Sequence, residues 1–119
     1  MRFEKEAAML HTKSLTLNKE FKRAYYRGQV FTSPVVVVYA VKNRQGVNRI
    51  GLTASKKIGK AVQRNRARRV MKEAYRLMEQ QFPIGWDFVL VARTKTVYSR
   101  TGDVMKALDA ARAHLFSKP

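Results

Sequence analysis

The 119-residue chain contains no cysteine, and only eight of its residues are acidic. Without cysteine the protein can form neither disulfides nor thiolate sites, which suits a reducing cytoplasm. No apolar run reaches the roughly 18–20 residues that a membrane-spanning helix needs. Residues 1–13 mix acidic with basic side chains and lack the apolar stretch of a secretory signal peptide. We therefore expect a soluble cytoplasmic protein.

The shortage of acidic residues leaves a large excess of positive charge. Lysine and arginine together number 25, and the formal net charge at pH 7 is +17. Charge of this size opposes compaction and favours association with a polyanion, such as a nucleic acid, an anionic membrane or an acidic protein. Because 45% of the residues are hydrophobic, we still expect a folded domain rather than a disordered basic tail.

Apolar periodicity predicts an α+β fold in which helices pack on a small central sheet. Residues 1–15 show no clear period, and we expect a variable segment there, loose or with a short helix over 4–10. Residues 16–119 are predicted to form a single domain. Its elements follow the order α-β-β-α-β-α: a helix over 18–27 with Asn18 as its N-cap, a strand over 35–41, a hairpin turn over 43–46, an antiparallel strand over 48–54, a long helix over 60–81, a strand over 86–92 and a closing helix over 103–116.

The positive charge is concentrated in the predicted long helix and the residues just before it. Nine basic residues and a single acidic residue, Glu73, lie between positions 56 and 76. At about 100° per residue, this helix has a basic side and an apolar side. The basic side carries Arg64, Asn65, Arg68, Arg69, Lys72 and Arg76, with Arg66 at its far edge. The apolar side carries Ala67, Val70, Met71, Ala74, Leu77 and Met78.

A solvated charged face is the simplest interpretation of such a stripe. However, like charges one turn apart, at 64, 68, 72 and 76, destabilise a helix unless a partner neutralises them. Nucleic-acid phosphates would do so and would release counterions. A membrane surface is a poorer partner, because the apolar side is rich in Ala and Met and lacks bulky anchors. The stripe therefore favours RNA or DNA.

Three aromatic residues lie close to this charge in the predicted fold. Phe21 and Tyr25 are one turn apart on the first helix, and Tyr39 lies in the first strand. They either pack in the core or line a groove in which unstacked bases dock. The residues alone leave both interpretations open.

Residues 51–69 carry a recognisable motif. They read Gly-Leu-Thr-Ala-Ser-Lys-Lys-Ile-Gly-Lys-Ala-Val-Gln-Arg-Asn-Arg-Ala-Arg-Arg. This segment resembles the signature of the bacterial ribonuclease P protein family, in which Arg-Asn-Arg follows a Ser-Lys-Lys-hydrophobic-Gly-x-Ala-Val lead. Further matches keep the family's order at 17–21, Gly28, Tyr39 and 85–93, so the resemblance covers about 15–116. Ala67 departs from it, being smaller than the branched residue often found there.

The resemblance implies a left-handed β-α-β crossover, as in domain IV of elongation factor G, against the usual right-handed preference. It also implies an accessory subunit of an endoribonuclease, with no catalytic side chain of its own. The family's RNA subunit binds Mg²⁺ and hydrolyses the phosphodiester bond. The implied partners are ribonuclease P RNA and the 5′ leader of precursor tRNA, and no DNA is expected.

The resemblance further assigns residues to two binding sites, here carried over by position. Contacts to the catalytic RNA are expected from Lys56, Lys57, Lys60, Arg64, Asn65, Arg66, Arg68, Arg69 and Lys72. Contacts to the tRNA leader are expected from Phe21, Tyr25, Tyr39, Ser55, Lys57, Arg64, Arg68 and Lys72. Gly51 and Gly59 are expected to serve the backbone, with Gly59 allowing a positive φ or a close approach before the helix.

Two other functions compete with this assignment. A ribonuclease acting without RNA usually needs paired histidines or a carboxylate–metal cluster. His11 and His114 instead lie near opposite ends of the sequence, and the acidic residues are scattered. A ribosomal or DNA-binding protein would share the charge, but strands flank the long helix here, unlike a helix-turn-helix. Co-purification with one structured RNA, with ribosomal subunits or with genomic DNA would separate these classes.

Overall fold

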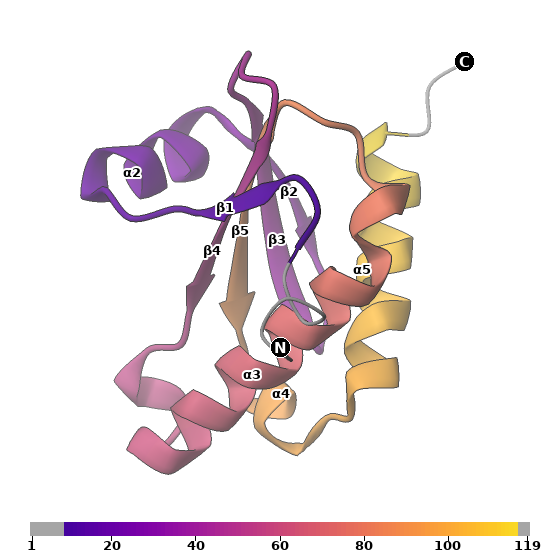
Figure 1. Cartoon of the computed structure of the whole chain (residues 1–119). Coiled ribbons are helices and arrows are strands. Elements are labelled where there is room, and N and C mark those ends of the chain that lie inside the picture. The colour runs from indigo at the N-terminus through magenta and orange to yellow at the C-terminus, as the bar shows by residue number, and fades with distance from the viewer. Residues whose placement is uncertain (1–8, 117–119) are drawn as a thin grey trace, which may run out of the picture.

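The computed structural model describes residues 9–116, in which helices pack on both faces of one five-stranded sheet (Figure 1). The strands are β1 (Thr12–Ser14), β2 (Gln29–Thr32), β3 (Val36–Lys42), β4 (Asn48–Thr53) and β5 (Trp86–Ala92). The helices are α2 (Asn18–Arg27), α3 (Ala61–Met78), α4 (Thr94–Tyr98) and α5 (Thr101–Phe116), with 3₁₀ turns at Lys56–Ile58 and Glu79–Gln81. The predicted α+β class is confirmed.

The central crossover also agrees with the prediction. The strand order is β1-β4-β5-β3-β2, so β4 and β5 are neighbours, and they run parallel. In Figure 1 both strands point downward and β5 lies to the right of β4. Helix α3, which joins them, crosses in front of the sheet. The β4-α3-β5 connection is therefore left-handed, against the usual preference for such units.

The predicted antiparallel hairpin is wrong in its pairing. β5 lies between β3 and β4, antiparallel to the first and parallel to the second. The backbone amide of Asn43, in the connecting turn, donates to the Gly85 carbonyl (2.8 Å), and its side-chain amide donates to Asp87 (2.8 Å). The turn reverses the chain as predicted, but two of its hydrogen bonds go to the segment that forms the start of β5.

The two faces of the sheet carry separate cores. α3 and α5 cover one face, where Val38 and Leu90 are among the buried residues. α2 packs alone on the opposite face, where Ala24 and Val89 are buried (Figure 1). This second core is small, so several side chains between α2 and the sheet are only partly buried.

The residues before α2 are held at the edge of the sheet. β1 pairs in parallel with β4. The buried carboxylate of Glu79 accepts hydrogen bonds from the amides of Leu10 (2.7 Å) and His11 (2.9 Å) and from the hydroxyl of Thr12. The loose conformation expected up to residue 15 therefore does not apply to Thr12–Ser14. The alternative helix over 4–10 falls mainly outside the described residues.

Several element boundaries differ from the predicted ones. The N-cap of α2 is Leu17 rather than Asn18, and its amide donates to the Glu20 carboxylate (3.1 Å). The long helix ends at Met78 and continues as a 3₁₀ turn. Leu77, expected on its apolar side, is 49% exposed, while Tyr75 is buried. The short elements β1, β2 and α4 were not predicted, because three to five residues carry too little periodicity.

Candidate nucleic-acid interface

The long helix has the two sides that the sequence predicts. Ala67, Val70, Met71 and Ala74 are buried against the sheet and α5. On the other side Asn65, Arg69 and Lys72 are exposed, and Arg64 and Arg68 are partly buried. One feature of the stripe differs from the expectation: Arg76 is paired with Glu73 (2.7 Å). This pairing lowers the pKa of Glu73, chiefly through the hydrogen bond from Arg76.

Basic residues also surround the start of α3. Ser55, Lys56, Lys57 and Lys60 are exposed, and the two adjacent lysines lie in a 3₁₀ turn. The turn ends at Gly59, whose φ of 150° is unfavourable for other residues. A Cβ atom at this position would lie 2.3 Å from Oε1 of Gln63. The expected backbone role of Gly59 is confirmed, and it presents the lysines beside the first turn of α3.

The arginines of the Arg-Asn-Arg motif differ in how they are held. Nε of Arg64 is buried and has no hydrogen-bond partner within residues 9–116. The guanidinium of Arg66 donates to the carbonyls of Val97 (2.9 Å) and Ser99 (3.0 Å). Arg66 thus fastens the C-terminal end of α4 to α3. Its contact with RNA remains a prediction, to be made with the donors that these two bonds leave free.

Arg68 lies on the opposite side of α3 from Arg66. Its guanidinium donates to Oδ1 of Asn65 (3.0 Å) and to the carbonyl of Ala54 (3.4 Å), which directly follows β4. The basic helix is therefore connected to the end of β4. The same strand contributes Gly51 to the other face of the sheet, where α2 packs.

The three predicted aromatic residues come together on the face that α2 covers. The ring centroids of Tyr25 and Tyr39 are 5.0 Å apart, with the rings nearly perpendicular at 79°. Phe21 and Tyr39 are partly buried, and Tyr25 is 40% exposed. Phe21 lies directly on β4, since a Cβ atom at Gly51 would be 2.4 Å from Cε1 of Phe21. The expected backbone role of Gly51 is thus a close approach of Phe21 to β4.

An ion-pair network, which sequence reasoning missed, connects α2 to β4 and β5. Asp87 is fully buried and accepts two 2.8 Å hydrogen bonds from Arg49, and Arg23 lies 3.6 Å away. Arg49 also pairs with Glu20 of α2. The hydrogen bond with Asp87 raises the pKa of Arg49 despite its burial. No sequence pattern brings these residues together, because Arg49 and Asp87 meet only through the β4–β5 register.

The candidates for a protein-only ribonuclease are placed apart from this surface. His11 lies 3.8 Å from Glu79, and the ring of His114 lies 5.3 Å from that of Phe31. Within residues 9–116 no three histidines or carboxylates gather as metal ligands would. Over the same range, none of the helices combines the length and the apolar character needed to cross a membrane.

Comparisons with known proteins agree with this arrangement. Residues 9–115 match the model of the Ribonuclease P family. The chain is 38% identical over 98 residues to the ribonuclease P protein component of Clostridioides difficile (strain 630). The aligned residues make up 82% of this chain and 86% of that protein. It is 39% identical over 103 residues to the same component of Clostridium acetobutylicum, and this alignment covers 85% of this chain and 83% of that protein.

Solved structures give the same result. The ribonuclease P protein from Thermotoga maritima superposes with a TM-score of 0.75 at 25% identity, covering 86% of this chain and 96% of that one. The protein from Staphylococcus aureus gives 0.72 at 26% identity, covering 87% and 92%. Fold, motif and sequence likeness thus agree: the chain belongs to the ribonuclease P protein family and is the protein component of a ribonucleoprotein that processes the 5′ ends of tRNAs.

Proposed function

We propose that this protein binds the ribonuclease P RNA through α3 and the lysines before it, and the 5′ leader of precursor tRNA through the aromatics of α2 and β3. The connection at the end of β4 carries this proposal, because it joins the basic helix to the aromatic face. Phe21 packs on Gly51 of β4, and Arg68 binds the carbonyl of Ala54 just after it. Two RNA strands bound to these surfaces would lie close together.

Binding of the RNA subunit is supported by the free charge on α3. Arg69 and Lys72 are exposed and make no ion pair within the described part of the chain. Each phosphate that they neutralise releases counterions, which makes the affinity fall as salt rises. The arginine fork also suits bidentate contact with phosphate oxygens.

Leader binding is supported by the accessibility of the aromatic rings. Tyr25 keeps 40% of its surface exposed, although it contacts Tyr39. An unpaired base stacked on such a ring gains about 1–3 kcal/mol and does so largely regardless of its identity. The protein would therefore accept many leader sequences, with Ser55, Lys57, Arg64, Arg68 and Lys72 contacting phosphates.

In this proposal the RNA subunit performs the endonucleolytic hydrolysis and holds Mg²⁺. The protein contributes by lowering the electrostatic repulsion between the ribonuclease P RNA and the precursor tRNA, because a protein with a net charge of +17 is bound between them. Less Mg²⁺ is then needed to screen the same repulsion. No protein side chain is assigned to bond cleavage.

The leader contact is tested with the reconstituted protein–RNA complex and two substrates, a precursor tRNA and the same tRNA without its leader. Tyr25→Ala should weaken precursor binding about 5- to 100-fold, the equivalent of one lost stacking contact. Its affinity for the leaderless tRNA should not change. The control is Tyr26→Ala, which removes an 85% exposed tyrosine from the outer side of the same helix. An equal loss for both substrates would contradict leader binding at Tyr25.

A further inference from the structure

The end of α4 presents a tyrosine that the described chain leaves uncovered. Tyr98 is 74% exposed, although its neighbours Thr96 and Val97 are buried. The helix is thus fixed to the core while this one large aromatic side chain points outward. Val62, near the start of α3, is similarly exposed at 78%.

Arg66 holds the backbone on both sides of this tyrosine. Its guanidinium binds the carbonyl of Val97 on one side and that of Ser99 on the other. The backbone at Tyr98 is therefore fixed, and ordering it on binding costs little further conformational entropy. Val62 precedes Arg66 by one helical turn on the same side of α3, so both exposed apolar side chains adjoin this contact.

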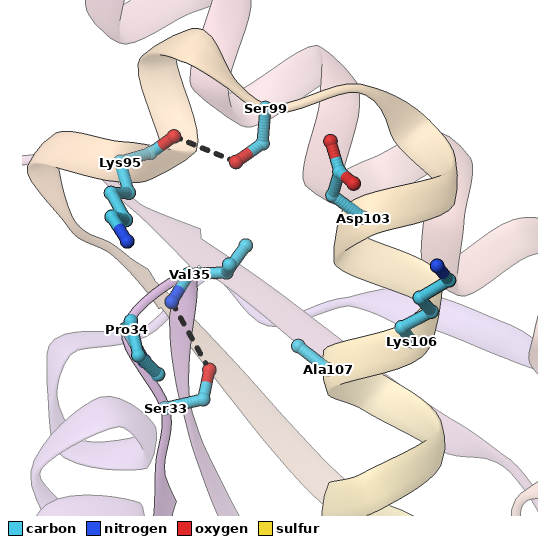
Figure 2. Close-up of a pocket in the computed structure, with 8 residues that line it drawn as sticks. All are labelled: Ser33, Pro34, Val35, Lys95, Ser99, Asp103, Lys106 and Ala107. Atoms are coloured by element: carbon cyan, nitrogen blue, oxygen red, sulfur yellow. Dashed lines mark hydrogen bonds between the residues drawn. The ribbon is translucent and has the colours of Figure 1, made fainter.

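The surroundings of Tyr98 are basic. Residues 93–100 include Arg93, Lys95 and Arg100 but no acidic residue. Lys95 lies three positions before Tyr98 on α4, close enough to act together with it. Figure 2 shows Lys95 on the rim of an open hollow of about 480 Å³ between α4, α5 and Pro34. The carboxylate of Asp103 across this hollow accepts from the Arg100 amide (2.9 Å) and makes no ion pair with Lys95.

The position of Tyr98 indicates which RNA it would meet. Around the axis of α3, Arg66 lies about 160° from Arg68, and Arg69 lies between them. Arg68 faces the end of β4 and the aromatic side, whereas Arg66 faces α4. Tyr98 therefore extends the basic surface of α3 on the side away from Tyr25 and Tyr39.

We propose that Tyr98 and Lys95 are a further contact with the ribonuclease P RNA. An unpaired base of that RNA stacks on the Tyr98 ring, and an adjoining phosphate pairs with Lys95. The three basic residues of 93–100, with no acidic residue among them, favour a polyanion over a protein partner. This inference rests on the proposed binding of the RNA subunit across α3.

The test is the equilibrium affinity of the full-length protein for a bacterial ribonuclease P RNA, without tRNA, over a range of salt concentrations. Tyr98→Ala should weaken binding about 5- to 100-fold, whereas Tyr98→Phe should keep the wild-type affinity because it keeps the ring. Lys95→Ala should reduce the magnitude of the slope of log affinity against log salt concentration by about the contribution of one phosphate contact. Tyr26→Ala is the matched control for an exposed tyrosine elsewhere and should change nothing.

The outcomes separate this inference from the proposed function. If the wild type binds the RNA and Tyr98→Ala binds equally well, the contact at Tyr98 is wrong while the role of α3 stands. Equal losses in Tyr98→Phe and Tyr98→Ala would overturn stacking. If the wild-type protein does not bind the RNA at all, both proposals fail. Because Tyr98 is exposed, Tyr98→Ala should unfold at the wild-type temperature, which checks that folding is intact.

Discussion

Arg49 and Asp87 face each other across β4 and β5, joined by two hydrogen bonds of 2.8 Å. Asp87 is fully buried, and Arg49 extends the contact to Glu20 of α2. The pair therefore links the two central parallel strands to the helix that carries Phe21 and Tyr25. We therefore expect the placement of those aromatics over the sheet to depend on this charge pair.

Asp87→Asn should lower the free energy of unfolding by about 3 kcal/mol, because it leaves the partly buried Arg49 without its main counter-charge. Urea denaturation measures this loss. The control is Asp109→Asn, which removes an exposed i,i+3 pair with Arg112 and should cost about 0.5 kcal/mol or less. Equal effects of the two substitutions would contradict a structural role for the Arg49–Asp87 pair.

Gly51→Ala should displace Phe21, since the added Cβ would lie 2.4 Å from its ring. Overpacking of this kind costs about 1–3 kcal/mol, and moving α2 should also weaken binding of the tRNA leader. Gly46→Ala is the matched control, because no atom lies within 4 Å of a Cβ there. A Gly51→Ala variant with wild-type stability and leader affinity would show that the contact has no such role.

Arg69→Ala and Arg66→Ala should differ in their effect on thermal stability. Arg69 is exposed on the basic side of α3, so its loss should weaken RNA binding without lowering the thermal stability. The slope of log affinity against log salt concentration should fall in magnitude by about one, the equivalent of one phosphate contact. Arg66 binds two carbonyls of the α4 end, so its loss should lower the unfolding temperature. Unchanged stability in Arg66→Ala would mean that its hydrogen bonds do not hold α4.

Glu79 should make the stability of the protein sensitive to acid. Burial alone would raise its pKa, but the hydrogen bonds from Thr12, His11 and Leu10 outweigh burial and lower the pKa. A carboxyl with a lowered folded-state pKa stabilises the protein above its unfolded-state pKa of about 4.3. This contribution is lost as the pH falls through the lower folded-state value.

Glu79→Gln should therefore be less stable than the wild type at pH 7, by about 1–3 kcal/mol for the disrupted buried hydrogen bonds. The difference should shrink as the pH falls below the unfolded-state pKa of about 4.3, because the unfolded wild-type carboxyl then binds a proton before the folded one does. Denaturation of both proteins between pH 3 and 7 measures it. A difference that stays constant over this range would contradict the lowered pKa.

The sequence predicted the parts of the fold that have strong local signals. The helix at 18–27 and the strand at 86–92 have the predicted bounds, and the basic and apolar sides of α3 follow from its 3.6-residue period. Gly59 and Gly51 were identified by their place in the motif. The aromatics Phe21, Tyr25 and Tyr39 were grouped from the predicted elements, and the family resemblance assigned them to leader binding. The structure brings them together.

What could not be predicted depends on contacts between distant segments. The turn at 43–46 looks like a hairpin, and nothing local indicates that β5 enters between its two strands. The two carbonyls that bind Arg66 lie in α4 and directly after it, about 30 residues away, so the motif alone gave Arg66 only an RNA contact. Glu79 resembles an ordinary surface acid at a helix end until β1 covers it.

The most direct test of the account is cleavage of precursor tRNA at low Mg²⁺ by a bacterial ribonuclease P RNA, with and without this protein. We expect cleavage at the mature 5′ end when protein and RNA are combined, little with the RNA alone, and none with the protein alone. Tight RNA binding without any stimulation of cleavage would contradict the proposed role. Cleavage by the nuclease-treated protein alone would show that its side chains, not the RNA, supply the catalyst.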